Sequence, residues 1–92
     1  MSDTWVDTLP QDKVDRWLST NGERAKKAYH TDDARFALWM SYVDRFVIRY
    51  SGLGAMDLPD YLYYDEYEVG TPPRDVAVDL LAENGFDVGE EE

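Results

Sequence analysis

The central part of the chain has the clearest repeat of apolar and polar positions. Five large apolar residues recur there at alternating spacings of three and four: Phe36, Trp39, Val43, Phe46 and Tyr50. This spacing places them on one face of a helix, and further apolar residues leave only a narrow polar strip. We therefore predict a helix over about 32–50, capped by Thr31 or Asp32 and ended by Gly52.

Two weaker patterns precede this helix. A hydroxyl at Thr8, followed three residues later by the amide of Gln11, has the form of a capping box. Apolar residues at helical spacing come next and predict a helix. Asn21-Gly22 is a typical helix end, so we expect this helix to stop there. Residues 23–30 predict another short helix, or a segment that merges with its neighbours.

Beyond Gly54 the chain changes character. Tyrosines and acidic residues are interleaved there without a clean helical or strand period. We predict two short turns or helices in this stretch, one around 58–62 and one around 64–68.

A last helix is predicted from the residues that follow. Thr71 is expected to cap it, with Pro72 at its first position. Asn84-Gly85 is expected to end it, and Phe86 to fold back on the core.

These patterns predict an all-α fold, a small bundle of about four helices around the central apolar helix 32–50. We assign residues 1–88 to a single helical domain and residues 89–92 to an acidic tail. Of the 92 residues, 43% are hydrophobic and 14% aromatic, which excludes an intrinsically disordered chain. The chain has no cysteine and no apolar run of about 20 residues, so we expect no disulfide, no membrane span and a cytoplasmic location.

Charge is divided unequally between the two halves. Residues 1–50 carry eight acids and eight bases, whereas residues 51–92 carry twelve acids and one base, Arg74. The whole net charge of −11 therefore lies in the second half. A field of one sign attracts basic protein surfaces and repels nucleic acid and anionic membranes. We expect the bases of the first half to pair with these acids across the bundle.

The interleaved tyrosines and carboxylates are the candidate binding site. Tyrosine brings a large, rigid contact surface, and carboxylates pair with arginine or imitate nucleic-acid phosphates. The predicted partner-binding residues combine both types: Asp57, Asp60, Tyr61, Tyr64, Asp65, Glu66 and Glu68. The alternative is that two or three tyrosines close the core while the acids face water. A Ca²⁺ or Mg²⁺ site is not predicted, because apolar residues occupy positions where ligands should alternate.

Catalytic chemistry has no clear signal. His30 is the only histidine, and the sequence shows no nucleophile elbow, phosphate loop or paired metal-ligand spacing. We therefore predict no enzyme, no catalytic residue, no metal and no cofactor. Direct nucleic-acid binding is not expected either, because the bases are matched by acids.

Part of the chain resembles a known group of proteins. The pattern consists of Gly52-Leu53, Asp57-Leu58-Pro59-Asp60-Tyr61, Asp65-Glu66-Tyr67-Glu68, Gly70, Pro72-Pro73-Arg74-Asp75 and Asn84-Gly85. Over about residues 41–86 it resembles small uncharacterised acidic proteins encoded by phages and plasmids. The resemblance implies an accessory protein of a mobile element, and it supplies no catalytic or ligand residue.

The sequence as a whole predicts a non-enzymatic acidic interaction protein acting in the cytoplasm of a host cell. Its expected partner is a basic protein surface, and the most concrete mechanism is inhibition of a nucleic-acid-binding protein by charge mimicry (a DNA mimic). The alternative is a self-associating structural or assembly module whose acidity serves solubility. Such a homodimer would pair along the apolar positions Phe36–Tyr50.

Overall fold

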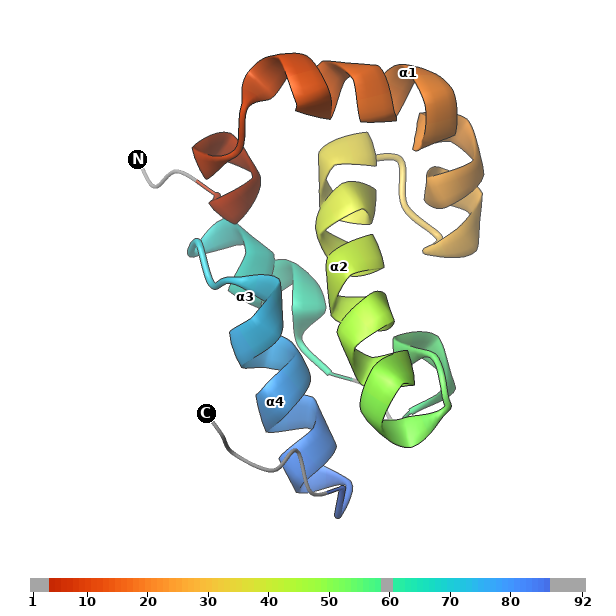
Figure 1. Ribbon diagram of the computed structural model, residues 1–92, viewed down its shortest axis with the longest axis vertical. Helices are drawn as coiled ribbons and strands as arrows, with labels where there is room; N and C mark the ends of the chain where they lie inside the picture. The colour runs from red at the N-terminus through yellow and green to blue at the C-terminus, as the bar shows by residue number, and fades with distance from the viewer. Residues whose placement is uncertain (1–3, 59–60, 87–92) are drawn as a thin grey trace.

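The computed structural model describes residues 4–58 and 61–86, and all regular structure within them is helical (Figure 1). The elements in chain order are η1 (Trp5–Thr8), α1 (Gln11–Ala28), α2 (Ala34–Ser51), η2 (Ala55–Asp57), α3 (Tyr63–Glu68) and α4 (Pro73–Glu83). The predicted all-α fold is confirmed. The predicted acidic tail 89–92 lies outside the described residues.

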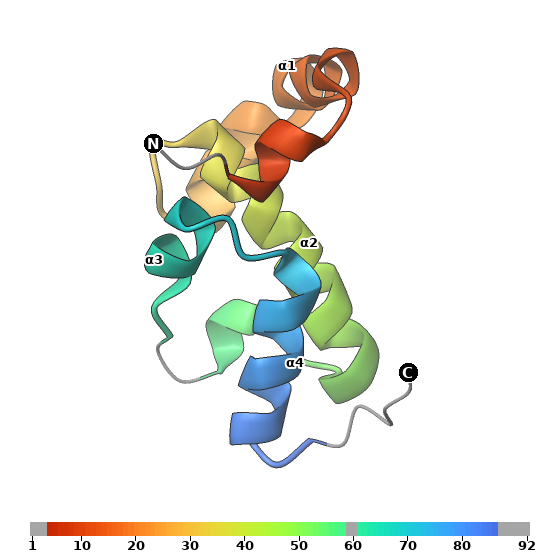
Figure 2. The same ribbon diagram turned by 90° about the vertical axis from the view of Figure 1, so that its left-hand side faces the viewer.

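Helix α2 is the centre of the molecule, as its apolar pattern predicts. It contacts all five other elements, and the two views show α1 across its beginning and α4 alongside it (Figures 1 and 2). Trp39 on α2 is fully buried, and its indole N–H donates to the carbonyl oxygen of Thr71 at 2.9 Å. Full burial of a large apolar side chain contributes about 1.5–3 kcal/mol, and α2 supplies seven buried residues to the core.

The two ends of α2 are set by different residues. Asp33 is the N-cap, and its Oδ1 accepts from the backbone N–H groups of Arg35 and Phe36 at 3.1 Å each. The predicted cap at Thr31 or Asp32 is therefore wrong; the Thr31 hydroxyl instead accepts from the Asp33 N–H at 3.0 Å. The predicted end at Gly52 is confirmed, with a φ of 76° that favours glycine.

Helix α1 is longer than its sequence pattern predicts. Asn21-Gly22 does not end it, and residues 23–30 largely merge into the same helix, which ends at Ala28. Gly22 is buried, and a Cβ placed there would lie 3.9 Å from the Cβ of Ala34 at the start of α2. The glycine therefore lies where α1 passes close to α2, inside a helix rather than at its end.

The predicted capping box at the start of α1 is also wrong. The Thr8 hydroxyl donates to the carbonyl of Trp5, and the Gln11 amide donates to the carbonyls of Val6 and Leu9. Both side chains thus complete the preceding η1 turn. Pro10 takes the N-cap position without a side-chain hydrogen bond.

The C-terminal helix α4 begins one residue later than predicted. Pro72 is its N-cap and the buried Pro73 its first residue, while the Thr71 hydroxyl donates to Glu66 at 2.7 Å instead of capping the helix. Its end agrees with the prediction, because Gly85 has a φ of 83° and Phe86 packs against the core.

Other expectations concern membranes and self-association. Among the described residues, no helix is long and apolar enough to cross a membrane. Phe36, Trp39 and Val43 are buried in the chain's own core, whereas Phe46 is half-buried and Tyr50 is exposed. A homodimer along Phe36–Tyr50 would therefore have only the last two residues of that face available.

Candidate interaction surface

The tyrosine-rich segment closes over the first half of α2. Tyr67 is only 5% exposed and meets Phe36 and Trp39 edge-on, with ring centroids 5.3 and 5.8 Å apart. Figure 2 shows α3 beside the beginning of α2, the part of that helix that carries Phe36 and Trp39. Tyr67 is thus a core residue, which agrees with the alternative that some tyrosines cover the core.

The predicted site residue Tyr61 also has a structural role. Its hydroxyl donates to Asp79 Oδ2 of α4 at 2.6 Å, and its ring packs partly against the core. Burial and the hydrogen bond to the Asp79 carboxylate raise the pKa of Tyr61 well above its usual range. Tyr61 therefore ties the beginning of the α3 segment to α4.

Tyr64 is the tyrosine of the predicted site that reaches solvent. It is 44% exposed, and one side of its ring packs edge-on against Phe36 with a centroid distance of 5.0 Å. Its hydroxyl donates to Asp33 Oδ2 at 3.3 Å. Partial burial and the Asp33 carboxylate raise the pKa of Tyr64.

The predicted acids differ in what they contact. Asp57 accepts from the Gly54 N–H at 3.3 Å within η2, and Glu66 accepts from the Thr71 hydroxyl. Asp65 and Glu68 are exposed on α3. Asp60 lies outside the described residues. The structure therefore brings Tyr64, Asp65 and Glu68 together as candidate contact residues and gives Tyr61 and Glu66 positioning roles.

Two exposed apolar residues at the ends of α3 are missing from the predicted site. Leu62 is 72% exposed and Val69 69% exposed. They are the N-cap and C-cap residues of this six-residue helix and so lie at its two ends. We call Leu62, Tyr64, Asp65, Glu68 and Val69 the α3 outer face. The sequence did not predict this face, because a helix of so few turns shows no repeat of apolar and polar positions.

The charge of the second half is not neutralised within the described residues. Two ion pairs are present there, Lys26 with Glu23 and Arg35 with Asp7, and both lie within residues 1–50. The predicted pairing of bases with the acidic half across the bundle is therefore wrong for the described residues. Seven described acids accompany Arg74 in the second half: Asp57, Asp65, Glu66, Glu68, Asp75, Asp79 and Glu83.

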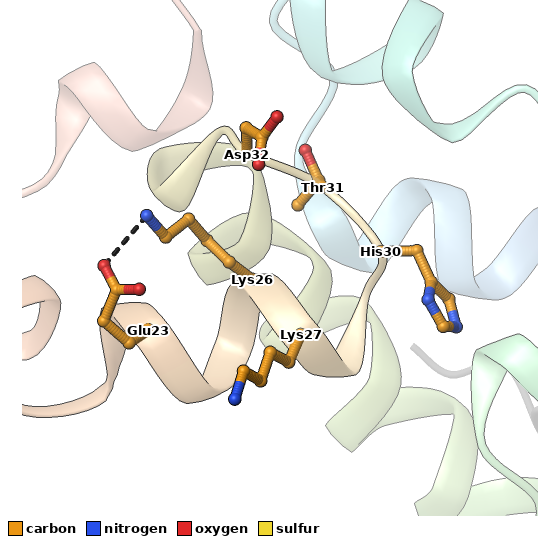
Figure 3. A pocket seen from close by; sticks show the side chains of 6 residues that line it. All are labelled: Glu23, Lys26, Lys27, His30, Thr31 and Asp32. Atoms are coloured by element: carbon orange, nitrogen blue, oxygen red, sulfur yellow. Dashed lines mark ion pairs between the residues drawn. The ribbon is translucent and has the colours of Figure 1, made fainter.

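The turn between α1 and α2 forms a separate open depression of about 500 Å³ (Figure 3). Lys26 and Glu23 pair there at 2.9 Å, while Lys27 and His30 point away from this pair. His30 is exposed and has a φ of 54°. Nothing in this arrangement assembles a nucleophile with a base. Nor do the described residues contain a group of three or more side chains suited to hold a metal ion.

No family model, curated protein or solved structure matches the chain. The resemblance to phage and plasmid proteins therefore stays a prediction, and the function must be argued from the surface of this molecule.

Proposed function

We propose that the protein is a non-enzymatic binding protein whose α3 outer face engages a basic surface of a partner protein. The observation that carries the proposal is the uncompensated charge of the second half, where no described acid forms an ion pair. Such a field raises the local concentration of basic surfaces and speeds their association.

The α3 outer face adds short-range contacts to this field. Leu62 and Val69 would each lose exposed apolar surface on binding, and the rigid ring of Tyr64 would lie between partner side chains. Asp65 and Glu68 are free to accept charge-assisted hydrogen bonds from arginine or lysine. A protein surface that normally binds nucleic-acid phosphates presents such arginine and lysine donors. Binding of the α3 outer face would therefore block that surface by charge mimicry.

Affinity capture with matched variants tests the proposal. The immobilised protein is compared with the double variant Asp65→Asn/Glu68→Gln and with the control Asp12→Asn/Asp15→Asn, which removes the same charge from exposed positions of α1. We expect wild type and control to retain one basic protein that is released as salt rises. The α3 variant should lose it. Equal retention by all three proteins would refute a role for the α3 outer face.

A second candidate is self-association, and one observation favours it. Three exposed apolar residues follow one another near the C-terminal end of α2: Ile48 on the helix, Leu53 in the turn after it and Met56 in η2. Sedimentation equilibrium at micromolar concentration distinguishes the candidates. A stable dimer that is broken by Ile48→Lys would favour assembly, and a monomer at all concentrations would exclude it.

A further inference from the structure

A groove on a different part of the surface joins three segments that are far apart in the sequence. It is lined by Trp5 of η1, Tyr42 and Phe46 of α2, and the Pro72-Pro73-Arg74 start of α4, and it has a volume of about 190 Å³. Pockets that enclose a drug-sized ligand measure about 300–1,000 Å³. The Trp5 groove, as we call it, is therefore suited to one inserted side chain rather than to a whole ligand.

The Trp5 groove is lined by aromatic rings and the guanidinium of Arg74, and a second guanidinium, that of Arg45, lies at its Tyr42 ring. Trp5 and Tyr42 meet edge-on with centroids 5.2 Å apart. The guanidinium of Arg74 lies over the Phe46 ring at 5.9 Å, and that of Arg45 lies over the Tyr42 ring at 5.4 Å. A guanidinium presents several N–H donors in a fixed fork, which can bind a carboxylate in bidentate fashion.

The charge around the Trp5 groove is opposite to that of the whole molecule. No described carboxylate lines it, and none lines the two adjoining hollows that share Tyr42 or Trp17. Four bases line these three hollows: Lys13, Arg24, Arg45 and Arg74. The chain has 20 acids and 9 bases, so a surface with four bases and no acid departs strongly from its composition.

No described carboxylate neutralises Arg74 in the Trp5 groove or Arg45 beside it. Arg45 and Arg74 form no ion pair with a described carboxylate, although Arg74 is the one base of the acidic half. Two cations beside an apolar hollow are therefore left without a counter-anion among the described residues.

We propose that the Trp5 groove binds an acidic peptide segment of a partner protein. An aliphatic or aromatic side chain of that segment would enter the hollow, and its neighbouring carboxylates would bind Arg74 and Arg45. This surface is separate from the α3 outer face, so the proposal does not depend on which partner binds there. A protein with both surfaces would hold a basic protein surface and a short acidic segment at the same time.

Two other occupants fit the groove less well. Single-stranded nucleic acid stacks its bases on open ring faces, whereas guanidiniums cover faces of Tyr42 and Phe46. A long polyanion is also repelled by the net charge of −11. A second copy carries the same net charge and is repelled similarly, while a short peptide brings only a few charges.

Nuclear magnetic resonance with defined probes tests this inference. The full chain, labelled with ¹⁵N, is titrated with the capped peptide Glu-Glu-Leu-Glu-Glu. The matched probes are Gln-Gln-Leu-Gln-Gln, Glu-Glu-Gly-Glu-Glu and an oligothymidylate. The indole N–H of Trp5 is the readout, and that of the buried Trp39, bonded to Thr71, is the internal reference. Arg74→Gln is compared with Arg16→Gln, which removes the same charge from an exposed position on α1.

We expect saturable movement of the Trp5 signal with the acidic leucine peptide and weaker effects from each matched peptide. Arg74→Gln should weaken binding about tenfold or more, because a charge-assisted hydrogen bond is lost, and Arg16→Gln should leave it unchanged. Equal binding by the two variants, or a stronger response to the oligothymidylate, would overturn the proposal. So would a Trp5 signal that depends on protein concentration without any probe, which would indicate a second copy in the groove.

Discussion

Asp33 shows how one side chain can serve both the fold and the candidate surface. One of its oxygens caps α2, and the other accepts from the hydroxyl of Tyr64. The carboxylate therefore fixes the start of the central helix and one edge of the α3 outer face together. The sequence predicted the cap at Thr31 or Asp32, and the three-dimensional path of the chain places it at Asp33 instead.

Replacing this cap should destabilise the protein. We expect Asp33→Ala to lower the free energy of unfolding by about 0.5–2 kcal/mol, because two helix N–H groups lose their acceptor. Urea denaturation measures the effect. The control is Asp32→Ala, an exposed neighbour of the same charge, which should change stability by less. Equal effects of the two substitutions would contradict the assigned cap.

Because of Tyr29, we expect the free energy of unfolding to depend on pH in the alkaline range. Its hydroxyl donates to Asp44 Oδ2 at 3.0 Å, and Asp44 Oδ1 also accepts from the Ala55 N–H at 2.7 Å. Burial and the Asp44 carboxylate raise the pKa of Tyr29 well above its usual range. Tyrosine is neutral when protonated, so the folded state holds this proton more tightly than the unfolded state. Stability is then fully present below about pH 10, the unfolded pKa, and falls as the pH rises above it.

The Tyr29→Phe variant isolates this contribution. The loss of unfolding free energy between about pH 8 and about pH 11 should be smaller in this variant than in the wild type, because one linked proton is removed. Tyr50→Phe, which alters an exposed tyrosine, serves as the control. An unchanged pH dependence in Tyr29→Phe would show that this hydroxyl is not linked to folding.

At the scale of elements, a long apolar period predicts well and short signals predict poorly. The α2 helix was predicted nearly to its ends because its burial on several sides enforces a regular pattern. The signals that failed were local ones: the capping box at Thr8, the stop at Asn21-Gly22 and the first residue of α4. Each of these features depends on contacts with another segment of the chain, which the local sequence does not reveal. Gly22 is the clearest case, since it lies inside α1 beside Ala34 at the start of α2 and does not end a helix.

Gly22 and Gly52 should respond in opposite ways to alanine. The space at Gly22 allows a Cβ at ordinary contact distance, so Gly22→Ala should stabilise the protein by about 0.5–1 kcal/mol through helix propensity. Gly52→Ala should destabilise it by about 1–2 kcal/mol, because the left-handed backbone disfavours a side chain. Thermal unfolding of the two variants checks both signs. Destabilisation by Gly22→Ala would indicate a closer helix contact than described.

The candidate site was predictable only in part, and for the same reason. Composition located the acidic, tyrosine-rich segment, and Tyr64, Asp65 and Glu68 do lie together at the surface. The inward turn of Tyr67 and the exposure of Leu62 and Val69 depend on how a helix of six residues is rotated against α2. No period in so short a helix reveals that rotation.

At the scale of the whole molecule, the net charge of −11 acts against folding. Ion pairs offset little of it within the described residues, so screening should help the folded state. We expect the urea midpoint to rise when NaCl increases from low concentration to about 0.5 M, where the screening length is only a few ångströms. A midpoint that falls with salt would mean that attractive charge pairs outweigh the repulsion.

The binding footprint of a captured basic partner tests the central claim most directly. The ¹⁵N-labelled protein is titrated with that partner, and the backbone signals that move or broaden are mapped on the surface. We predict a footprint centred on the α3 outer face, with the signals around Leu62, Asp65 and Val69 changing most. It should disappear in Asp65→Asn/Glu68→Gln. A footprint centred on the exposed end of α2 around Ile48, with α3 unchanged, would contradict the account.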